Sequence, residues 1–283
     1  MLKQRIITAV LLLLVLLPTL FYPSPEPFSA LVLLLIGAAA WEWGRLNRFS
    51  QWAALLSGAL SVALCSATWY LGWLSQPLPW VWSMVGGCWV LLGGWLLRRG
   101  VPVWESIPRA VRWGLGMVAL WATWVAVAQA RWIGINFLLS ILVLVWVADI
   151  AAYFAGKAFG GRFCATKLAP SISPGKSWEG VWGGMVGVVL LAWGWRWVDQ
   201  LGWVSQPSLY SRLSESGDWF LLLAVLFLTV MSVVGDLVES LIKRSAGVKD
   251  SSGLLPGHGG VLDRVDALLP TLPLAMMLVT LVR

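Results

Sequence analysis

The chain has 283 residues, of which 59% are hydrophobic and only 12% are charged, and its formal net charge is +7. The charged share is about half of the roughly 25% found in soluble globular domains, which excludes a disordered chain and a pair of water-soluble domains. In so apolar a chain, the positive charge indicates a membrane surface as the partner and argues against nucleic acid.

Long apolar stretches recur along the whole sequence. A membrane-spanning helix needs about 20 apolar residues to cross a hydrocarbon core of about 30 Å. The predicted spans are 6–21, 28–45, 52–74, 80–97, 110–130, 134–155, 180–197, 219–242 and 267–282. The first resembles a signal peptide, but no small-residue cleavage site follows it, so we expect an uncleaved helix. The predicted fold is therefore all-α, a polytopic membrane bundle of about nine transmembrane helices.

The basic residues predict an orientation for these spans. With the N-terminus in the cytoplasm, nine alternating spans leave 16 of the 20 Lys and Arg residues in cytoplasmic segments. The other four are Arg131, Arg196, Arg212 and Arg283. This bias follows the positive-inside rule. We therefore expect a multi-pass protein of the cell (inner) membrane, with its N-terminus and its two most polar loops in the cytoplasm.

Two residue classes inside the spans are informative. Four glycines in the seventh span form small-xxx-small patterns typical of close helix packing; they are Gly180, Gly183, Gly184 and Gly187. Four acids also lie within spans, where ionisable groups are costly and often functional; they are Glu42, Asp149, Asp236 and Glu239. Glu42 precedes Arg45 by three residues, so an ion pair between these two is the simplest interpretation.

The cytoplasmic ends of the sixth and eighth spans each carry a polar helix face. The residues are Asp149, Tyr153 and Lys157 in the sixth span, and Asp236, Glu239, Ser240 and Lys243 in the eighth. Their helical spacing places each set on one face. Because both faces lie at the same membrane depth, they predict one shared water-filled site. Two independent stabilising pairs are the alternative.

A Gly-rich loop, residues 156–180, follows the sixth span and contains Gly175-Lys176-Ser177. This triplet is similar to a phosphate-binding P-loop, but the motif requires a glycine where Pro170 stands and a preceding strand. A Gly-rich turn with a lysine before a helix N-terminus still suits a phosphate. A flexible loop with a helix cap near Ser177 is the alternative.

The second polar segment, residues 240–266, holds four basic residues, three acidic residues and the only histidine. Its carboxylates and hydroxyls are hard oxygen ligands that suit Mg²⁺, whereas Zn²⁺ would favour more His or Cys. Its Lys and Arg residues suit a polyphosphate, and its glycines allow the backbone to approach a ligand closely.

With its lead-in 235–239, this segment closely resembles the signature of the phosphatidate cytidylyltransferase (CDP-diacylglycerol synthase) family, S-x-x-K-R-x4-K-D…P-G-H-G-G-x-x-D-R-x-D. All fixed positions are present from Ser240 to Asp266. The polar residues of the sixth span and the run 173–180 are similar to the family's upstream motifs. Three positions differ from the residue that the family often has: this chain has Gly175 in place of a basic residue, Ser177 in place of Thr and Ala267 in place of Ser.

The resemblance divides the chain in two. Residues 140–283 carry it and would form the catalytic region, whereas residues 1–139 match only in hydropathy and would form a scaffold that dimerises. The activity implied is transfer of CMP from CTP to phosphatidate, with CDP-diacylglycerol and pyrophosphate as products. By resemblance, Asp236 and Asp263 are Mg²⁺ ligands and Ser240 is a third, with Asp266 or Asp250 near a second metal ion.

The remaining predicted site residues would bind or orient the substrates. The four bases of the second segment, which the sequence does not divide between triphosphate and lipid phosphate, are Lys243, Arg244, Lys249 and Arg264. His258 would serve as acid, orienter or phosphate donor. Further predicted substrate contacts are Asp149, Tyr153, Lys157, Ser173, Lys176, Ser177, Glu179, Ser240, Asp250, Gly259 and Gly260.

Three other functions compete with this one. A CTP-dependent lipid kinase would share the site but release CDP. A transporter would use the intramembrane acids as a relay, yet the halves show no repeat and the polar cluster is terminal. A CDP-alcohol phosphotransferase would need a D-G-x2-A-R…G-x3-D-x3-D run, which the sequence lacks.

Overall fold

The computed structural model describes residues 2–282, without the side chains of residues 2 and 3; Arg283 lies outside the described residues. Within this part the chain is helical, and its only extended pairing is two isolated bridges in the polar loops. Nine of the described helices are long and apolar enough to cross a membrane. The predicted all-α polytopic bundle is confirmed.

The long helices follow the predicted spans closely. They are α1 (Leu2–Phe21), α2 (Glu26–Leu46), α3 (Gln51–Tyr70), α4 (Pro79–Arg99), α6 (Arg109–Ile133), α7 (Ile135–Phe159), α8 (Trp178–Gln200), α10 (Asp218–Ala246) and α12 (Leu268–Leu281). Short helical pieces lie between them: η1 (Trp73–Ser75), α5 (Val101–Ser106), α9 (Leu209–Ser214) and α11 (Leu262–Val265).

Two spans differ from the prediction in a way that local chemistry explains. The third ends at Tyr70 instead of residue 74, because Gly72 adopts a left-handed φ of 75° and turns the chain into η1. In the ninth, α12 has 14 residues and is only about 21 Å long, so α11 completes the span. Pro270 lies in the first turn of α12. Backbone N–H groups there have no acceptor within the helix, so the N–H that proline lacks costs no helical hydrogen bond.

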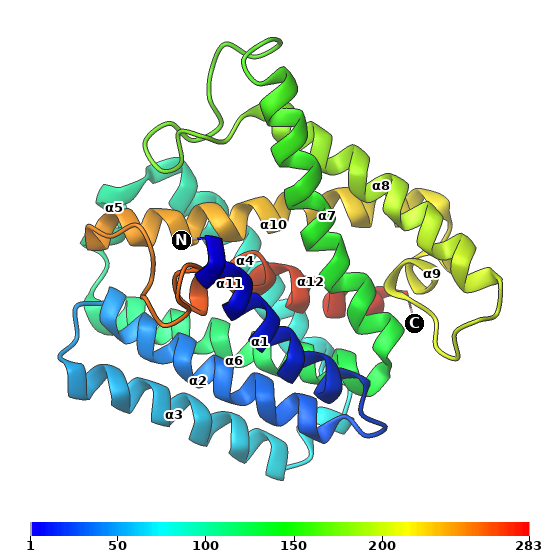
Figure 1. Ribbon diagram of the computed structural model, residues 1–283, viewed down its shortest axis with the longest axis horizontal. Helices are drawn as coiled ribbons and strands as arrows, with labels where there is room; N and C mark the ends of the chain where they lie inside the picture. The colour runs from blue at the N-terminus through cyan, green and yellow to red at the C-terminus, as the bar shows by residue number, and fades with distance from the viewer. Residues whose placement is uncertain (1, 283) are drawn as a thin grey trace.

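The helices form two packed groups around α12 (Figure 1). Helices α2, α3 and α6 lie side by side, and α12 packs between α6, α4 and α10. Helices α7 and α8 form a close pair that leans across α10. The first polar loop connects α7 to α8 at the top of the view, and the second leaves the end of α10 at the left, beside α5 (Figure 1).

The pair α7–α8 depends on small residues, as the small-xxx-small pattern predicts. A Cβ atom on Gly184 would lie 3.0 Å from the carbonyl oxygen of Ala148, and one on Gly187 would lie 2.7 Å from the Cβ of Ala151. The two backbones therefore approach closely. This contact fixes the end of α7 relative to the start of α8, and the first polar loop connects them.

Candidate functional site

A pocket of about 410 Å³ opens between α7, the start of α8 and α10. Among its lining residues are six predicted site residues: Asp149, Tyr153, Lys157, Lys176, Ser177 and Asp236. The structure thus brings the polar face of the sixth span, the first polar loop and one end of the eighth-span face to a single cavity.

Lys176 reaches the pocket through a tight turn in the first loop. The N–H of Ser173 donates to the carbonyl of Ala169 at 2.8 Å, and the N–H of Lys176 donates to the carbonyl of Ser173 at 3.2 Å. The Lys176 ammonium then lies 2.5 Å from Oδ2 of Asp236. Ser177 caps α8, as predicted, by accepting the N–H of Gly180 at 3.2 Å. The same residue also lines the pocket.

Glu179 organises the first loop from inside. Its Oε1 accepts the backbone N–H groups of Gly161, Phe163 and Cys164 at 3.1, 3.0 and 2.9 Å, and the residue is buried. It does not line the 410 Å³ pocket. The structure therefore places Glu179, predicted as a substrate contact, behind the loop that carries Lys176.

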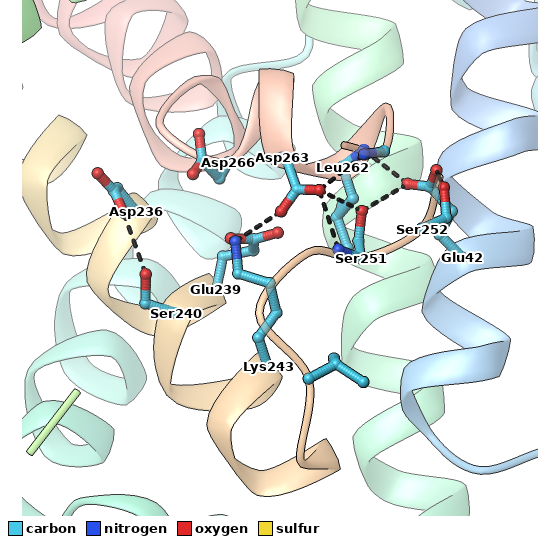
Figure 2. Close-up of polar contacts among 12 residues, drawn as sticks. Glu42, Asp236, Glu239, Ser240, Lys243, Ser251, Ser252, Leu262, Asp263 and Asp266 are labelled. Atoms are coloured by element: carbon cyan, nitrogen blue, oxygen red, sulfur yellow. Dashed lines mark hydrogen bonds and ion pairs between the residues drawn. The ribbon is translucent and has the colours of Figure 1, made fainter. Parts of the chain in front are cut away.

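The second polar segment folds around a buried network of charges (Figure 2). The Lys243 ammonium contacts the carboxylate of Glu239 and lies 2.6 Å from Oδ1 of Asp263. Oδ2 of Asp263 accepts the N–H of Ser251 at 2.9 Å and the N–H of Gly260 at 2.7 Å, and the Ser251 hydroxyl, whose one proton it shares with Glu42, lies 2.9 Å away. These bonds fix the Asp263 side chain, which is only 4% exposed.

The carboxylates of α10 and of the turn after α11 face one another. Asp266 interacts electrostatically with Asp236, Glu239 and Asp149. The approach is possible because Gly235 has no side chain: a Cβ there would lie 2.5 Å from the carbonyl oxygen of Asp266. Oδ1 of Asp236 also accepts the Ser240 hydroxyl at 3.3 Å, one helical turn along α10 (Figure 2).

Several predicted residues lie away from the pocket. Arg244 donates to the carbonyls of Ile172 at 3.4 Å and Val248 at 3.3 Å, and so links the two polar loops. Arg244, Lys249, Asp250 and Arg264 are all exposed. Nδ1 of His258 is buried without a hydrogen-bond partner among residues 2–282. Gly259, with a left-handed φ of 83°, packs against Asp263.

The predicted ion pair between Glu42 and Arg45 is wrong. Arg45 stacks over the ring of Trp41, 5.0 Å from its centroid, whereas Glu42 points into the bundle and is 0% exposed. Its carboxylate accepts hydrogen bonds from the second polar segment, more than 200 residues away. One signal was present in the sequence: Glu42 lies in a predicted span at the end of the bundle where that segment also lies.

Comparisons with known proteins cover the chain almost from end to end. Residues 3–282 match the model of the cytidylyltransferase family. The chain belongs to the cytidylyltransferase family. The phosphatidate cytidylyltransferase of Pseudomonas aeruginosa is 39% identical over 282 residues, which cover 96% of this chain and 95% of that protein. That of Haemophilus influenzae is 34% identical over 308 residues, with 96% of each chain covered.

These matches correct one expectation drawn from motifs. The likeness of this cytidylyltransferase to its relatives is not confined to residues 140–283, because the aligned region includes most of the first half. The second half contains the recognisable motifs. In the first half, long apolar helices with few charged residues offer no short pattern to compare.

The donor atoms of this cytidylyltransferase's site determine whether it suits a metal ion. No three His, Cys, Asp or Glu side chains of the described part gather closely enough to hold one. Asp236 and Asp263 each have one oxygen paired with a lysine ammonium. Mg²⁺ commonly takes one or two carboxylates and completes its shell with water and substrate phosphates. Two aspartates and the Ser240 hydroxyl fit that chemistry.

Proposed function

We propose that this chain transfers CMP from CTP to phosphatidate and so makes CDP-diacylglycerol and pyrophosphate. The observation that carries the proposal is the convergence of Asp149, Lys176 and Asp236 on one pocket at the end of membrane-spanning helices. The relatives named phosphatidate cytidylyltransferase, aligned over most of the chain, support this choice of substrates.

In the proposed reaction, a phosphate oxygen of phosphatidate attacks the α-phosphorus of CTP. The new P–O bond forms as the bond to the β-phosphate bridging oxygen breaks, and pyrophosphate leaves with that electron pair. The attacking monoester is already ionised near neutral pH, so the protein's contribution is positioning and charge neutralisation. Lys157 and Lys176, both on the pocket wall, would bind the phosphates.

Mg²⁺ is part of the proposal. Asp236 and Asp263 would hold it, with the Ser240 hydroxyl as a third ligand and Asp266 beside a second ion. When bound, the metal would neutralise charge on the nucleotide phosphates. Lys176 and Lys243, which contact these aspartates in the structure, would then turn toward the phosphates or remain as neighbours of the ion.

The proposed setting is the inner membrane, with the pocket at the cytoplasmic leaflet where CTP is available. The two polar loops contact each other through Arg244 and the carbonyl of Ile172, and the excess of basic residues in the segments assigned to the cytoplasmic side supports this orientation. The resemblance also implies a homodimer built through residues 1–139. The molecular mass of the protein in detergent tests that expectation.

The decisive experiment uses the purified full-length protein with labelled CTP, phosphatidate and Mg²⁺. We expect equimolar pyrophosphate and a cytidine-bearing lipid, loss of both when EDTA is added, and recovery with excess Mg²⁺. Release of CDP together with a phosphorylated lipid would instead identify a kinase. No nucleotide-bearing lipid under any of these conditions would refute the proposal.

A further inference from the structure

Glu42 connects the first half of the chain to the signature segment. Oε2 accepts the Ser251 hydroxyl at 3.0 Å and the N–H of Leu262 at 2.7 Å. Oε1 accepts the Ser252 hydroxyl at 2.5 Å and the N–H of Val261 at 2.9 Å. Four donors from one loop therefore converge on a single buried carboxylate (Figure 2), and hydrogen bonds to a charged acceptor are the stronger kind.

The loop is shaped to receive this carboxylate. Any side chain on Gly260 would collide with Oε1 of Glu42 and with the Ser251 hydroxyl, so the backbone closes over the acid only with glycine there. An ionised carboxylate is very costly to bury without partners. Because Glu42 is fully buried, the loop and the acid stabilise each other in this one arrangement.

Close packing of helix α2 against its neighbours holds Glu42 in place. A Cβ on Gly58 of α3 would lie 2.8 Å from the carbonyl oxygen of Gly37 of α2, and one on Gly44 would lie 2.9 Å from the Cα of Ala54. Helix α2 also packs on α6. Contacts this close leave little freedom for α2 to slide, so Glu42 is held in place relative to α3 and α6.

A single side chain, that of Ser251, lies between the carboxylates of Glu42 and Asp263. The Ser251 hydroxyl lies within hydrogen-bond distance of Oε2 of Glu42, at 3.0 Å, and of Oδ2 of Asp263, at 2.9 Å. The Val261 and Leu262 N–H groups bound by Glu42 immediately precede Asp263 in the chain. Both contacts act on the same turn, and that turn determines where Asp263 meets Lys243.

We infer that Glu42 is a positioning residue that holds the 251–263 turn so that the Asp263 carboxylate meets the Lys243 ammonium. The catalytic part of this inference depends on the proposed function. Partners that orient a ligand-bearing side chain typically contribute 10–100-fold to activity when they are removed. Glu42 acts through Asp263 and touches no substrate.

The test compares Glu42→Gln with Glu105→Gln, an exposed acid of α5. In Glu42→Gln an amide NH₂ replaces one acceptor and faces backbone donors. We expect hydrogen exchange of peptides covering 251–263 to rise about tenfold and kcat to fall about 10–100-fold, with KM for CTP changed less than threefold. Glu105→Gln should change neither quantity.

A coupling measurement separates positioning from general loss of stability. The double variant Glu42→Gln/Ser251→Ala should lose less kcat than the sum of the two single variants, because both changes remove the Glu42–Ser251 bond. If Glu42→Gln does not fold, Ser251→Ala/Ser252→Ala removes two of the four bonds from the loop side and should give the same rise in exchange.

Two results would overturn the inference: unchanged exchange in Glu42→Gln, or additive kcat losses in the double variant. If the wild-type protein makes no nucleotide-bearing lipid, the proposed function fails. The exchange measurement then still decides whether Glu42 holds the turn.

Discussion

Gly235→Ala tests whether the close approach of α10 to the start of α12 builds the site. In the native structure a Cβ at this position would lie 2.5 Å from the Asp266 carbonyl oxygen and 2.8 Å from Cγ and Cδ of Pro270. Non-bonded carbon atoms are most stable at about 3.5–4.0 Å. The two segments must therefore separate by roughly 0.7 Å or more.

This displacement falls on adjacent functional groups, because Asp236 follows Gly235 and Asp266 is the group that must move. A misplacement of about 1 Å can reduce a rate about 100-fold, whereas overpacking a core costs about 1–3 kcal/mol of stability. We expect kcat for pyrophosphate release to fall by about two orders of magnitude in a protein that still purifies and unfolds cooperatively.

The matched control is Gly194→Ala in α8, where a Cβ meets nothing within 4 Å. It should keep wild-type kcat. Activity of Gly235→Ala within threefold of wild type, measured beside this control, would show that the α10–α12 contact does not set the geometry of the site.

Three further substitutions probe single contacts. Asp263→Asn should reduce turnover by about 1,000-fold or more and lower the melting temperature of a protein that still folds, since an amide NH₂ must then face Lys243 or the Ser251 and Gly260 donors; turnover above a tenth of wild type would contradict its role. Lys176→Ala should raise KM for one phosphate substrate about 10–100-fold, and unchanged kinetics would remove the first loop from the site. Glu179→Gln should speed protease cleavage within residues 160–176 and raise the same KM, whereas unchanged cleavage would show that its three backbone contacts do not order the loop.

Hydropathy predicted the nine spans because bilayer thickness sets the required length of an apolar helix. Helical spacing likewise predicted that Asp149, Tyr153 and Lys157 share a face, and all three line the pocket. Span ends were less accurate where one glycine changes the chain direction, as Gly72 does. Local periodicity describes neighbours three or four residues apart. It therefore paired Glu42 with Arg45 and could not predict the contact between Glu42 and Ser251.

The four bases of the second segment show a different limit. The sequence treats Lys243, Arg244, Lys249 and Arg264 as equivalent cations. In the structure Lys243 is buried against two carboxylates and Arg244 joins the loops, while the other two face outward. Helical position explains the first two. The others depend on the path of a loop whose turns use left-handed glycines, and spacing does not encode that path.

The bond between α2 and the signature segment constrains how such chains can be recombined. A hybrid that joins the front portion of one relative to the rear portion of another would succeed only if the incoming second helix still presents a carboxylate at position 42. It would also need the same helix-to-helix spacing beneath that carboxylate. For the same reason, the second half expressed alone would leave the donors of the signature segment that bind Glu42 facing lipid or water.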